Sequence, residues 1–299
     1  MIKLSICIPT YNRPDFLYRA VASVISSKTD DIEILVFDNS ESSDSEEIIN
    51  SFHDPRIVYK RHKSNVGMLG NWNALLYTAN GEYIKFLNDD DWFDFGAIDM
   101  FLEHLDVYKG AIIYNYRAKY RNKFDQVVKM DSKIKSGNVR LSGIDAARKV
   151  YFGSNKFGVP SQSMFRREES LLSGGFGQEM SYALDVRLMA KMLYYGDVVF
   201  LDDVPVNILS HPQQANKFFT VGQKIKDQQE YYNILFDTFG SENPAKDRSA
   251  VNSFIAWHEA ALNFKSGNLI SAIKALNISR YKISGLKEFI RRDIIGGIS

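Results

Sequence analysis

The sequence lacks the features of a secreted or membrane-spanning protein. It has one cysteine, Cys7, which excludes an intrachain disulfide framework and is typical of a reducing cytoplasm. No stretch approaches the roughly 18 uninterrupted apolar residues of a membrane-spanning helix, and the short apolar run before Thr10 is not a signal peptide. We therefore expect a cytoplasmic protein that is not integral to a membrane, with Cys7 as a small buried hydrophobic residue.

Common phosphate-binding and catalytic motifs are also missing. There is no GxxxxGKS or GxxxxGKT loop and no GxGxxG after the first apolar run, and Gly67 and Gly70 in NVGMLGNWN fit neither pattern. GxSxG, HExxH and paired CxxC motifs are absent as well. With 37 basic and 36 acidic residues, the net charge of +1 gives no reason to expect nucleic-acid binding. Without a glycine cradle, a metal is the natural counter-charge for a bound diphosphate.

Strand-like and helix-like segments alternate through the first half of the chain. Short apolar runs predict buried strands, and apolar residues at helical spacing predict helices. The expected strands are 4–9, 32–37, 57–59 and 82–87, and the expected helices are 14–27, 44–52, 71–78 and 95–108. Because such alternation produces right-handed βαβ units, we expect an α/β fold with a mostly parallel central sheet flanked by helices.

The second half is less regular and ends in helices. Strands are expected at 111–116, 161–165, 198–201 and 204–209, helices at 142–151 and 182–195, and a hairpin or loop at 122–137. Helices alone are expected from Val221 onward, so we place a boundary near Lys217. Residues 280–294 combine an apolar stripe with basic side chains, which suits either peripheral contact with the inner face of a membrane or an ordinary docked helix. The C-terminal helices are also a candidate homodimer interface.

Three polar clusters follow predicted strands, at 10–13, 38–40 and 88–91. The carboxyl ends of parallel strands form one rim, and this rim is where ligands bind in such sheets. The last cluster contains the adjacent acids Asp89, Asp90 and Asp91, whose mutual repulsion a divalent cation would offset. The alternative is a solvated acidic turn before the next helix.

The motifs SICIPTYNRPDFL, ILVFDNSE, NVGMLGNWNAL, GEYIKFLNDDDW and GGFGQEMSYALDVRL occur in this order between residues 2 and 216. Together they resemble family 2 glycosyltransferases of the GT-A fold. The resemblance implies a GT-A catalytic domain at 1–217, with a nucleotide-sugar half at 1–110 and an acceptor half at 111–217. A helical extension would follow at 218–299. It also implies an inverting transferase that uses a nucleotide-diphosphate sugar and Mn²⁺ or Mg²⁺.

The resemblance assigns donor contacts to loops at the rim. The implied nucleotide-binding residues are Pro9, Thr10, Tyr11, Arg13, Asp38, Asn65, Gly67 and Asp89. The ring of Tyr11 would stack on the base. A carboxylate at Asp38 that accepts a ring N–H would favour uracil or thymine, so a UDP-sugar is favoured and a dTDP-sugar is the alternative.

The same resemblance implies the metal ligands and the catalytic base. Asp90 is the first metal candidate, with Asp91 and His211 as further ligands, although Asn88 replaces an acid of the family motif. Asp185 is the expected general base that deprotonates the acceptor, although its preceding partner is Leu184 rather than an acid. Its alternative role is to cap the helix that follows.

Two further residues complete the predicted site. Trp92 is expected beneath the donor sugar or in the acceptor groove, and Lys217 in a closing segment. The expected reaction is hexosyl transfer to a glycan or lipid-linked acceptor in surface polysaccharide assembly. A non-catalytic nucleotide-sugar-binding or scaffold protein on a degenerate GT-A fold is the alternative. A sugar-phosphate nucleotidyltransferase is disfavoured, because PTYNRP lacks a loop rich in glycine and basic residues.

Overall fold

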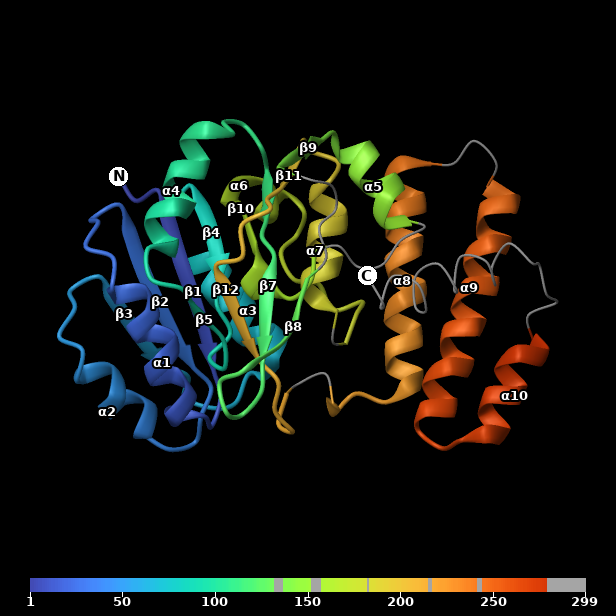
Figure 1. The fold of residues 1–299 in the computed structure, drawn as a ribbon, viewed down its shortest axis with the longest axis horizontal. Coiled ribbons are helices and arrows are strands. Elements are labelled where there is room, and N and C mark those ends of the chain that lie inside the picture. Colours follow the sequence, from blue (N-terminus) through green and yellow to red (C-terminus); the bar gives the residue numbers. More distant parts are fainter. Residues whose placement is uncertain (132–136, 152–156, 182, 215–216, 241–243, 279–299) are drawn as a thin grey trace.

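The computed structural model describes residues 1–131, 137–151, 157–181, 183–214, 217–240 and 244–278 (Figure 1). The described residues form a central sheet of eight strands in the order β3-β2-β1-β4-β10-β6-β11-β9. These strands are β1 (Leu4–Thr10), β2 (Ile32–Asp38), β3 (Ile57–Arg61), β4 (Tyr83–Phe86), β6 (Ile113–Asn115), β9 (Val139–Leu141), β10 (Ser163–Arg166) and β11 (Val198–Phe200). Strands β1 to β4 are mutually parallel, β11 is parallel to β6, and β9 and β10 are antiparallel to their neighbours. The predicted α/β fold with a mostly parallel sheet is confirmed.

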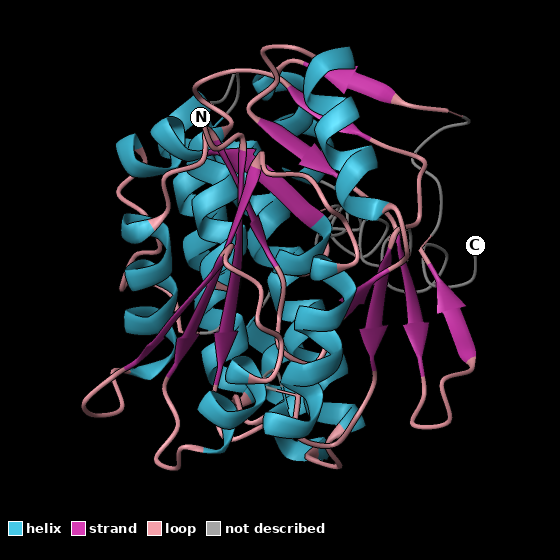
Figure 2. Ribbon diagram, turned by 90° about the vertical axis from the view of Figure 1, so that its left-hand side faces the viewer, coloured by secondary structure: helices cyan, strands magenta, loops and turns pink. Residues whose placement is uncertain are grey.

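Helices cover both faces of the central sheet (Figure 2). The helices of the described residues are α1 (Pro14–Ile25), α2 (Asp44–Asn50), α3 (Gly67–Thr78), α4 (Ala97–Val107), α5 (Gly143–Tyr151), α6 (Arg167–Leu172), α7 (Leu184–Met192), α8 (Val221–Phe239), α9 (Pro244–Lys265) and α10 (Leu269–Ile278). Helices α8, α9 and α10 stand side by side at one end of the molecule (Figure 1). The expected all-helical C-terminal region is therefore present, as far as the structure describes it.

Alternating side chains of the buried strands divide the core into two clusters. Ile6 and Ile8 face α1 and α4, whereas Cys7 faces the cluster that includes α3, α7 and α8. Burial of Cys7 raises the pKa of its thiol well above the ordinary value, so it is the inert hydrophobic residue that the sequence predicts. Tyr231 and Leu235 of α8 belong to this second cluster, so α8 shares the core of the sheet-bearing body.

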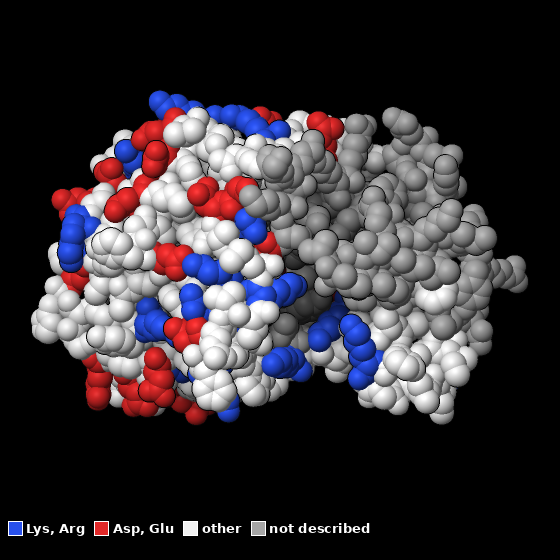
Figure 3. All heavy atoms as spheres, in the orientation of Figure 1, with Lys and Arg blue, Asp and Glu red and all other residues white. Residues whose placement is uncertain are grey.

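The register of the strands fixes the rim. Thr10 of β1 pairs with Asp38 of β2, and Cys7 pairs with Phe86 of β4. The polar clusters that follow β1, β2 and β4 therefore meet at one edge of the sheet, as expected. On the described part of the face shown in Figure 3, acidic and basic side chains are interspersed.

A second, four-stranded sheet was not expected from the sequence. It consists of β5 (Trp92–Phe93), β12 (Val206–Leu209), β7 (Ala118–Arg121) and β8 (Val127–Met130) in that order. Its strands are short and come from distant parts of the chain, so local periodicity cannot identify them. β8 lies within the predicted hairpin or loop region 122–137, whereas β5, β7, β9 and α6 were missed.

The next features concern a possible membrane and a possible second copy of the chain. No helix within the described ranges is long and apolar enough to cross a membrane. Residues 280–294, predicted to form a basic amphipathic helix, lie outside the described residues. Membrane contact and a homodimer both stay predictions.

Candidate active site

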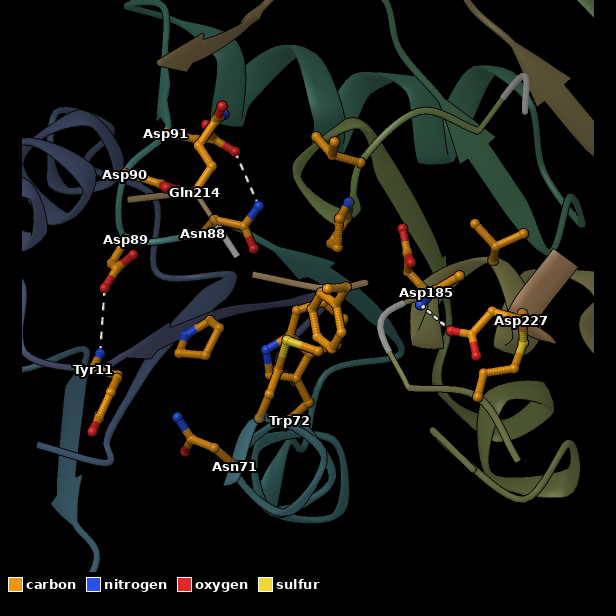
Figure 4. Close-up of a pocket in the computed structure, with 18 of the residues that line it drawn as sticks. Tyr11, Asn71, Trp72, Asn88, Asp89, Asp90, Asp91, Asp185, Gln214 and Asp227 are labelled. Carbon is orange, nitrogen blue, oxygen red and sulfur yellow. Dashed lines mark hydrogen bonds between the residues drawn. The ribbon is translucent and has the colours of Figure 1, made fainter. Parts of the chain in front are cut away.

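A cavity of about 580 Å³ opens at the carboxyl ends of the strands (Figure 4). Its wall includes ten of the predicted site residues: Pro9, Thr10, Tyr11, Arg13, Asn65, Gly67, Asp89, Asp90, Asp91 and Asp185. These residues come from the end of β1 and the segment after it, from the segment after β3 and the start of α3, from the turn after β4, and from the first turn of α7. Residues that are far apart in sequence and were assigned to one site therefore share one cavity.

Basic and polar side chains of the chain itself offset the charge of the acidic turn. Arg13 Nη1 lies 2.8 Å from Asp90 Oδ2 and 3.3 Å from Asp89 Oδ1. The Thr10 hydroxyl donates to Asp89 Oδ2 over 2.9 Å. Burial nevertheless raises the pKa of Asp89 to about 7. The solvated acidic turn is thus not what the structure shows, because the three carboxylates are buried.

Asp90 also forms a pair with His211, which follows β12. His211 Nε2 lies 2.8 Å from Asp90 Oδ2. The imidazole is buried, and its ring centroid lies 5.0 Å from that of Phe16. Its Nδ1 has no hydrogen-bond partner within the described part of the chain. A carboxylate oxygen and an imidazole nitrogen at this separation are a ligand pair that Mn²⁺ accepts once the proton between them is displaced.

Asp91 is directed away from this pair toward Ser161. Asp91 Oδ2 accepts the Ser161 hydroxyl over 2.6 Å and the Asn88 side-chain amide over 3.1 Å. Burial and the nearby charge of Asp90 raise the pKa of Asp91 well above its usual range. Asn88, which replaces an acid of the family motif, therefore supports the turn by hydrogen bonding. Among the described residues, no three His, Cys, Asp or Glu side chains already form a metal-binding group.

Ser161 is held by a buried lysine that sequence reasoning missed. Lys85 Nζ donates to the Ser161 carbonyl oxygen over 2.7 Å, and lies 4.7 and 4.9 Å from the ring centroids of Phe101 and Tyr116. Burial lowers the pKa of Lys85 well below its ordinary value. A lysine within the strand 82–87 gives no local signal of this role, because its partner lies about 75 residues later in the chain.

Four predicted residues are not part of the cavity wall that the described residues form: His211, Lys217, Asp38 and Trp92. Lys217 Nζ donates to the His211 carbonyl oxygen over 2.7 Å. Asp38 is fully buried and accepts the Ser40 N–H and the Tyr59 hydroxyl, each over 2.8 Å. Trp92 packs beneath Arg19, whose guanidinium carbon lies 3.4 Å from its ring centroid. Their proposed contacts with the base and the sugar would therefore require rearrangement.

Asn39, rather than its neighbour Asp38, is part of the cavity wall. It lines the cavity, and its amide donates to Asn65 Oδ1 over 2.6 Å. Asn65 Oδ1 also accepts the Gly67 N–H over 2.8 Å, and Gly67 has a φ of +72° that favours glycine. This network starts α3 four residues earlier than the predicted 71, and its three residues line one part of the cavity.

Asp185 lies in the first turn of α7 at the other end of the cavity. It is buried, and burial raises the pKa of its carboxyl group to about 7, although the N–H groups of Val186 and Asp185 itself partly offset this effect. A carboxyl group with a pKa near neutrality can accept a proton efficiently at physiological pH. The position of Asp185 is compatible with both roles expected from the sequence, the general base and the helix cap.

The loop before Asp185 is fixed by Asp227 of α8. The fully buried carboxylate of Asp227 accepts the Ser181 N–H at 2.8 and 2.9 Å and the Ala183 N–H at 3.1 Å. The C-terminal region thus holds the segment that carries the candidate base. This contact could not be predicted from the sequence, because a lone acid on an amphipathic helix has the pattern of a surface residue.

We expect Asp227→Ala to lower the free energy of unfolding by about 2–4 kcal/mol, because two backbone N–H groups lose a charged acceptor. Urea unfolding followed by circular dichroism measures this change. Asp237→Ala removes an exposed acid from the same helix and should change stability by less than about 0.5 kcal/mol. Equal effects of the two substitutions would contradict the anchoring role.

Comparison of folds defines the class of protein. The structure is similar to the crystal structure of S. aureus TarS 1-349 in complex with UDP-GlcNAc, with a TM-score of 0.66 and 13% identity over 97% of this chain and 79% of that chain. It is also similar to the mannosyltransferase PcManGT from Pyrobaculum calidifontis in complex with GDP-Man and Mn²⁺, with a TM-score of 0.57 and 13% identity over 95% of this chain and 77% of that chain. The fold is that of the GT-A glycosyltransferases.

Sequence comparison identifies the family. The model of Glycosyl transferase family 2 matches residues 5–171, so the chain belongs to this family and is a glycosyltransferase. A relative is the E. coli UDP-Glc:alpha-D-GlcNAc-diphosphoundecaprenol beta-1,3-glucosyltransferase WfaP, which is 32% identical over 120 residues. The aligned segment covers 40% of this chain and 47% of that protein. The predicted fold, family and enzyme class are confirmed.

Proposed function

We propose that the protein transfers a sugar, with inversion, from a nucleoside diphosphate donor to a hydroxyl group of a glycan or lipid-linked acceptor in surface polysaccharide assembly. A UDP-sugar is the favoured donor. The observation that carries the proposal is one cavity with Tyr11 and Asp89 at one end and Asp185 at the other (Figure 4). The activity named for the E. coli relative, a glucosyl transfer from UDP-Glc to a diphosphoundecaprenol-linked GlcNAc, supports the substrate classes.

The donor end suits a nucleotide. The ring of Tyr11 is 41% exposed and is therefore open to stacking on a base. Thr10, Asn65 and Gly67 border the same space. In our proposal Asp38 reaches the base only if Tyr59 releases its carboxylate, so Asn39 is an additional candidate for that contact.

Asp90 and His211 fit a divalent metal, because they bring a hard oxygen and an imidazole nitrogen within 2.8 Å of one another. We propose that they hold Mn²⁺ or Mg²⁺ together with donor phosphates, and that Asp91 joins only if it leaves Ser161. Bound there, the metal would supply positive charge that stabilises the departing diphosphate. Arg13, which lies against Asp89 and Asp90, is free to turn from these acids to the phosphates once the metal offsets their charge.

Asp185 performs the proton transfer in this proposal. As the acceptor oxygen forms its bond to the anomeric carbon, the bond from that carbon to the diphosphate breaks, and Asp185 takes the hydroxyl proton. Attack from the face opposite the leaving group inverts the configuration of the anomeric carbon. The proposed geometry requires the acceptor to lie against Asp185 and the diphosphate against the turn at Asp89 and Asp90.

The pKa of Asp185 gives a pH prediction. A base must be deprotonated to act, so kcat/KM for the acceptor should rise with pH through a midpoint near 7 and then level off. Initial rates measured at saturating donor between pH 5.5 and 9 give this rise of kcat/KM with pH. A limb with a midpoint near 4, the ordinary carboxyl value, would argue against Asp185 as the base.

Nucleotide binding and transfer together test the proposed function. We expect UDP to raise the melting temperature more than CDP, GDP or ADP, and to do so more strongly with Mn²⁺, because a ligand that binds the folded state stabilises it by mass action. The same protein should transfer sugar from a radiolabelled UDP-sugar to a lipid-linked or free glycan acceptor from a panel. Tight UDP binding with neither hydrolysis nor transfer would instead favour a non-catalytic binding protein.

A further inference from the structure

The cavity continues beyond Asp185 to a wall that belongs to the C-terminal helices. Gln228, Tyr231 and Tyr232 of α8 and His258 of α9 line it. In the close-up, Asp185 and Asp227 lie on the side opposite Tyr11 and Asp89 (Figure 4). These four residues lie outside the part of the chain that the family model matches, 5–171. The wall therefore lies beyond the part of the chain that identifies the family.

The wall lies on the Asp185 side of the cavity, where the proposed acceptor reacts. A general base must come within hydrogen-bonding distance of the hydroxyl that it deprotonates, so the acceptor ring has to lie against Asp185. In the proposed function the donor occupies the Tyr11 side, and Asp185 and the α8 residues line the same cavity. An acceptor that reacts at Asp185 therefore lies beside this wall.

The chemistry of the wall suits a sugar ring. Tyr231 and Tyr232 lie side by side, with ring centroids 5.5 Å apart and planes inclined by 57°. Aromatic faces pack against the C–H face of a pyranose, and a few polar groups then orient the hydroxyl groups. Gln228 and His258 supply such groups, and they are joined by a 2.7 Å contact between Gln228 Oε1 and His258 Nδ1.

The wall is rigid relative to the base. Tyr231 and Tyr232 belong to the same hydrophobic cluster as residues of α7 and the sheet. Asp227, one residue before Gln228, holds the loop that leads to Asp185. A ring bound on α8 is thereby placed at a fixed distance from the carboxylate, which is what an oriented attack requires.

We propose that Gln228, Tyr231, Tyr232 and His258 form the subsite for the sugar ring of the acceptor. This inference rests on the proposed transfer function. It identifies the acceptor as a saccharide at the reacting end, whether that saccharide is free or carried on a lipid. It also assigns acceptor selectivity to the C-terminal helices rather than to the loops that bind the nucleotide.

The test compares Gln228→Ala and Tyr231→Leu with wild type and with Gln229→Ala, a matched control at an exposed neighbouring position. We expect the two cavity variants to raise the acceptor KM about tenfold. The Kd for UDP with Mg²⁺, measured by calorimetry, and the rate of donor hydrolysis without acceptor should stay within about twofold of wild type. Gln229→Ala should match wild type in all three measurements. If Tyr231→Leu is poorly folded, the half-buried Gln228 still provides the test.

A second measurement does not depend on transfer. Saturation-transfer NMR with a panel of methyl α- and β-glycosides, in the presence of UDP and Mg²⁺, should show binding of at least one glycoside to wild type. That signal should be lost in Gln228→Ala and kept in Gln229→Ala. An unchanged acceptor KM in both cavity variants, with normal transfer, would overturn this inference and leave the proposed function intact. Absence of transfer by wild type would contradict the proposed function, while the glycoside signal would still decide the subsite.

Discussion

Asp185→Asn is expected to lower kcat for transfer by about 10²–10⁴-fold, the usual contribution of a general base, while UDP affinity changes little. Asn keeps the size of the side chain but cannot accept the acceptor proton. Because Asp185 lies in the first turn of α7, away from Tyr11 and Asp89, the nucleotide end should be undisturbed. Single-turnover kinetics at saturating donor and acceptor measure the loss directly.

The same substitution should make the protein more stable at alkaline pH. The pKa of Asp185 is about 7 in the folded protein and about 4 in the unfolded chain. The folded state therefore holds the proton more tightly, and its stability falls as pH rises from about 4 to about 7. At pH 8 the carboxylate is charged and buried, so Asn should raise the free energy of unfolding by about 2–4 kcal/mol. Below pH 4 the gain should vanish.

Urea titrations at pH 4, 6 and 8 would show this pH-dependent gain. The matched control is Asp106→Asn, which changes an exposed acid on α4 and should leave both kcat and the pH dependence of stability unchanged. Loss of activity together with loss of stability at pH 8 would mean that Asp185 is a structural cap rather than the base. The base and the cap therefore predict opposite changes in the free energy of unfolding at pH 8 when Asp185 is replaced by Asn.

Asp90→Asn is expected to abolish the metal dependence of donor binding. Asn keeps the shape but removes the charge that Arg13 and His211 share at Asp90 Oδ2. The Mn²⁺-dependent part of the UDP-induced rise in melting temperature should disappear. Transfer should fall by about 10³-fold or more, since a metal at a leaving group contributes several kcal/mol.

Asp94→Asn is the matched control for that experiment. Asp94 lies four residues later, outside the cavity wall that the described residues form, and interacts with Lys119 and the buried Asn207 rather than with the acidic turn. It should keep both the metal dependence and the transfer rate. If Asp90→Asn binds UDP with the same Mn²⁺ dependence as wild type, the metal is held elsewhere. His211→Ala, measured in parallel, shows whether the imidazole contributes to the same affinity.

The parts of the site that lie next to strand ends could be predicted from the sequence. The polar residues after β1 and β4 are local features, and parallel pairing brings Thr10, Asp89 and Asp90 to one rim without further information. Their individual partners could not be predicted. Ser161, which holds Asp91, is supplied by a short 3-10 turn about seventy residues later, and no periodicity links the two.

Predictions that depended on side-chain direction were less informative. Asp38 lies at the expected strand end, but Tyr59 on the neighbouring strand β3 engages its carboxylate. Trp92 belongs to a two-residue strand of the second sheet, where it contacts Arg19. The aromatic residues of α8 have the spacing of ordinary core residues. The sequence therefore does not indicate that Tyr231 also lines the cavity.

The burial of Cys7 makes this chain a ready background for site-specific labelling. Its only thiol lies in the middle of β1 with no exposed surface, and burial keeps it in the unreactive protonated form. A cysteine introduced at the exposed Val66, between Asn65 and Gly67 of the cavity wall, or at the exposed Leu269 on α10, would thus be the sole site for maleimide dyes or spin labels. The separation of the segment at Val66 from the C-terminal helices could be followed during turnover without first removing a native cysteine.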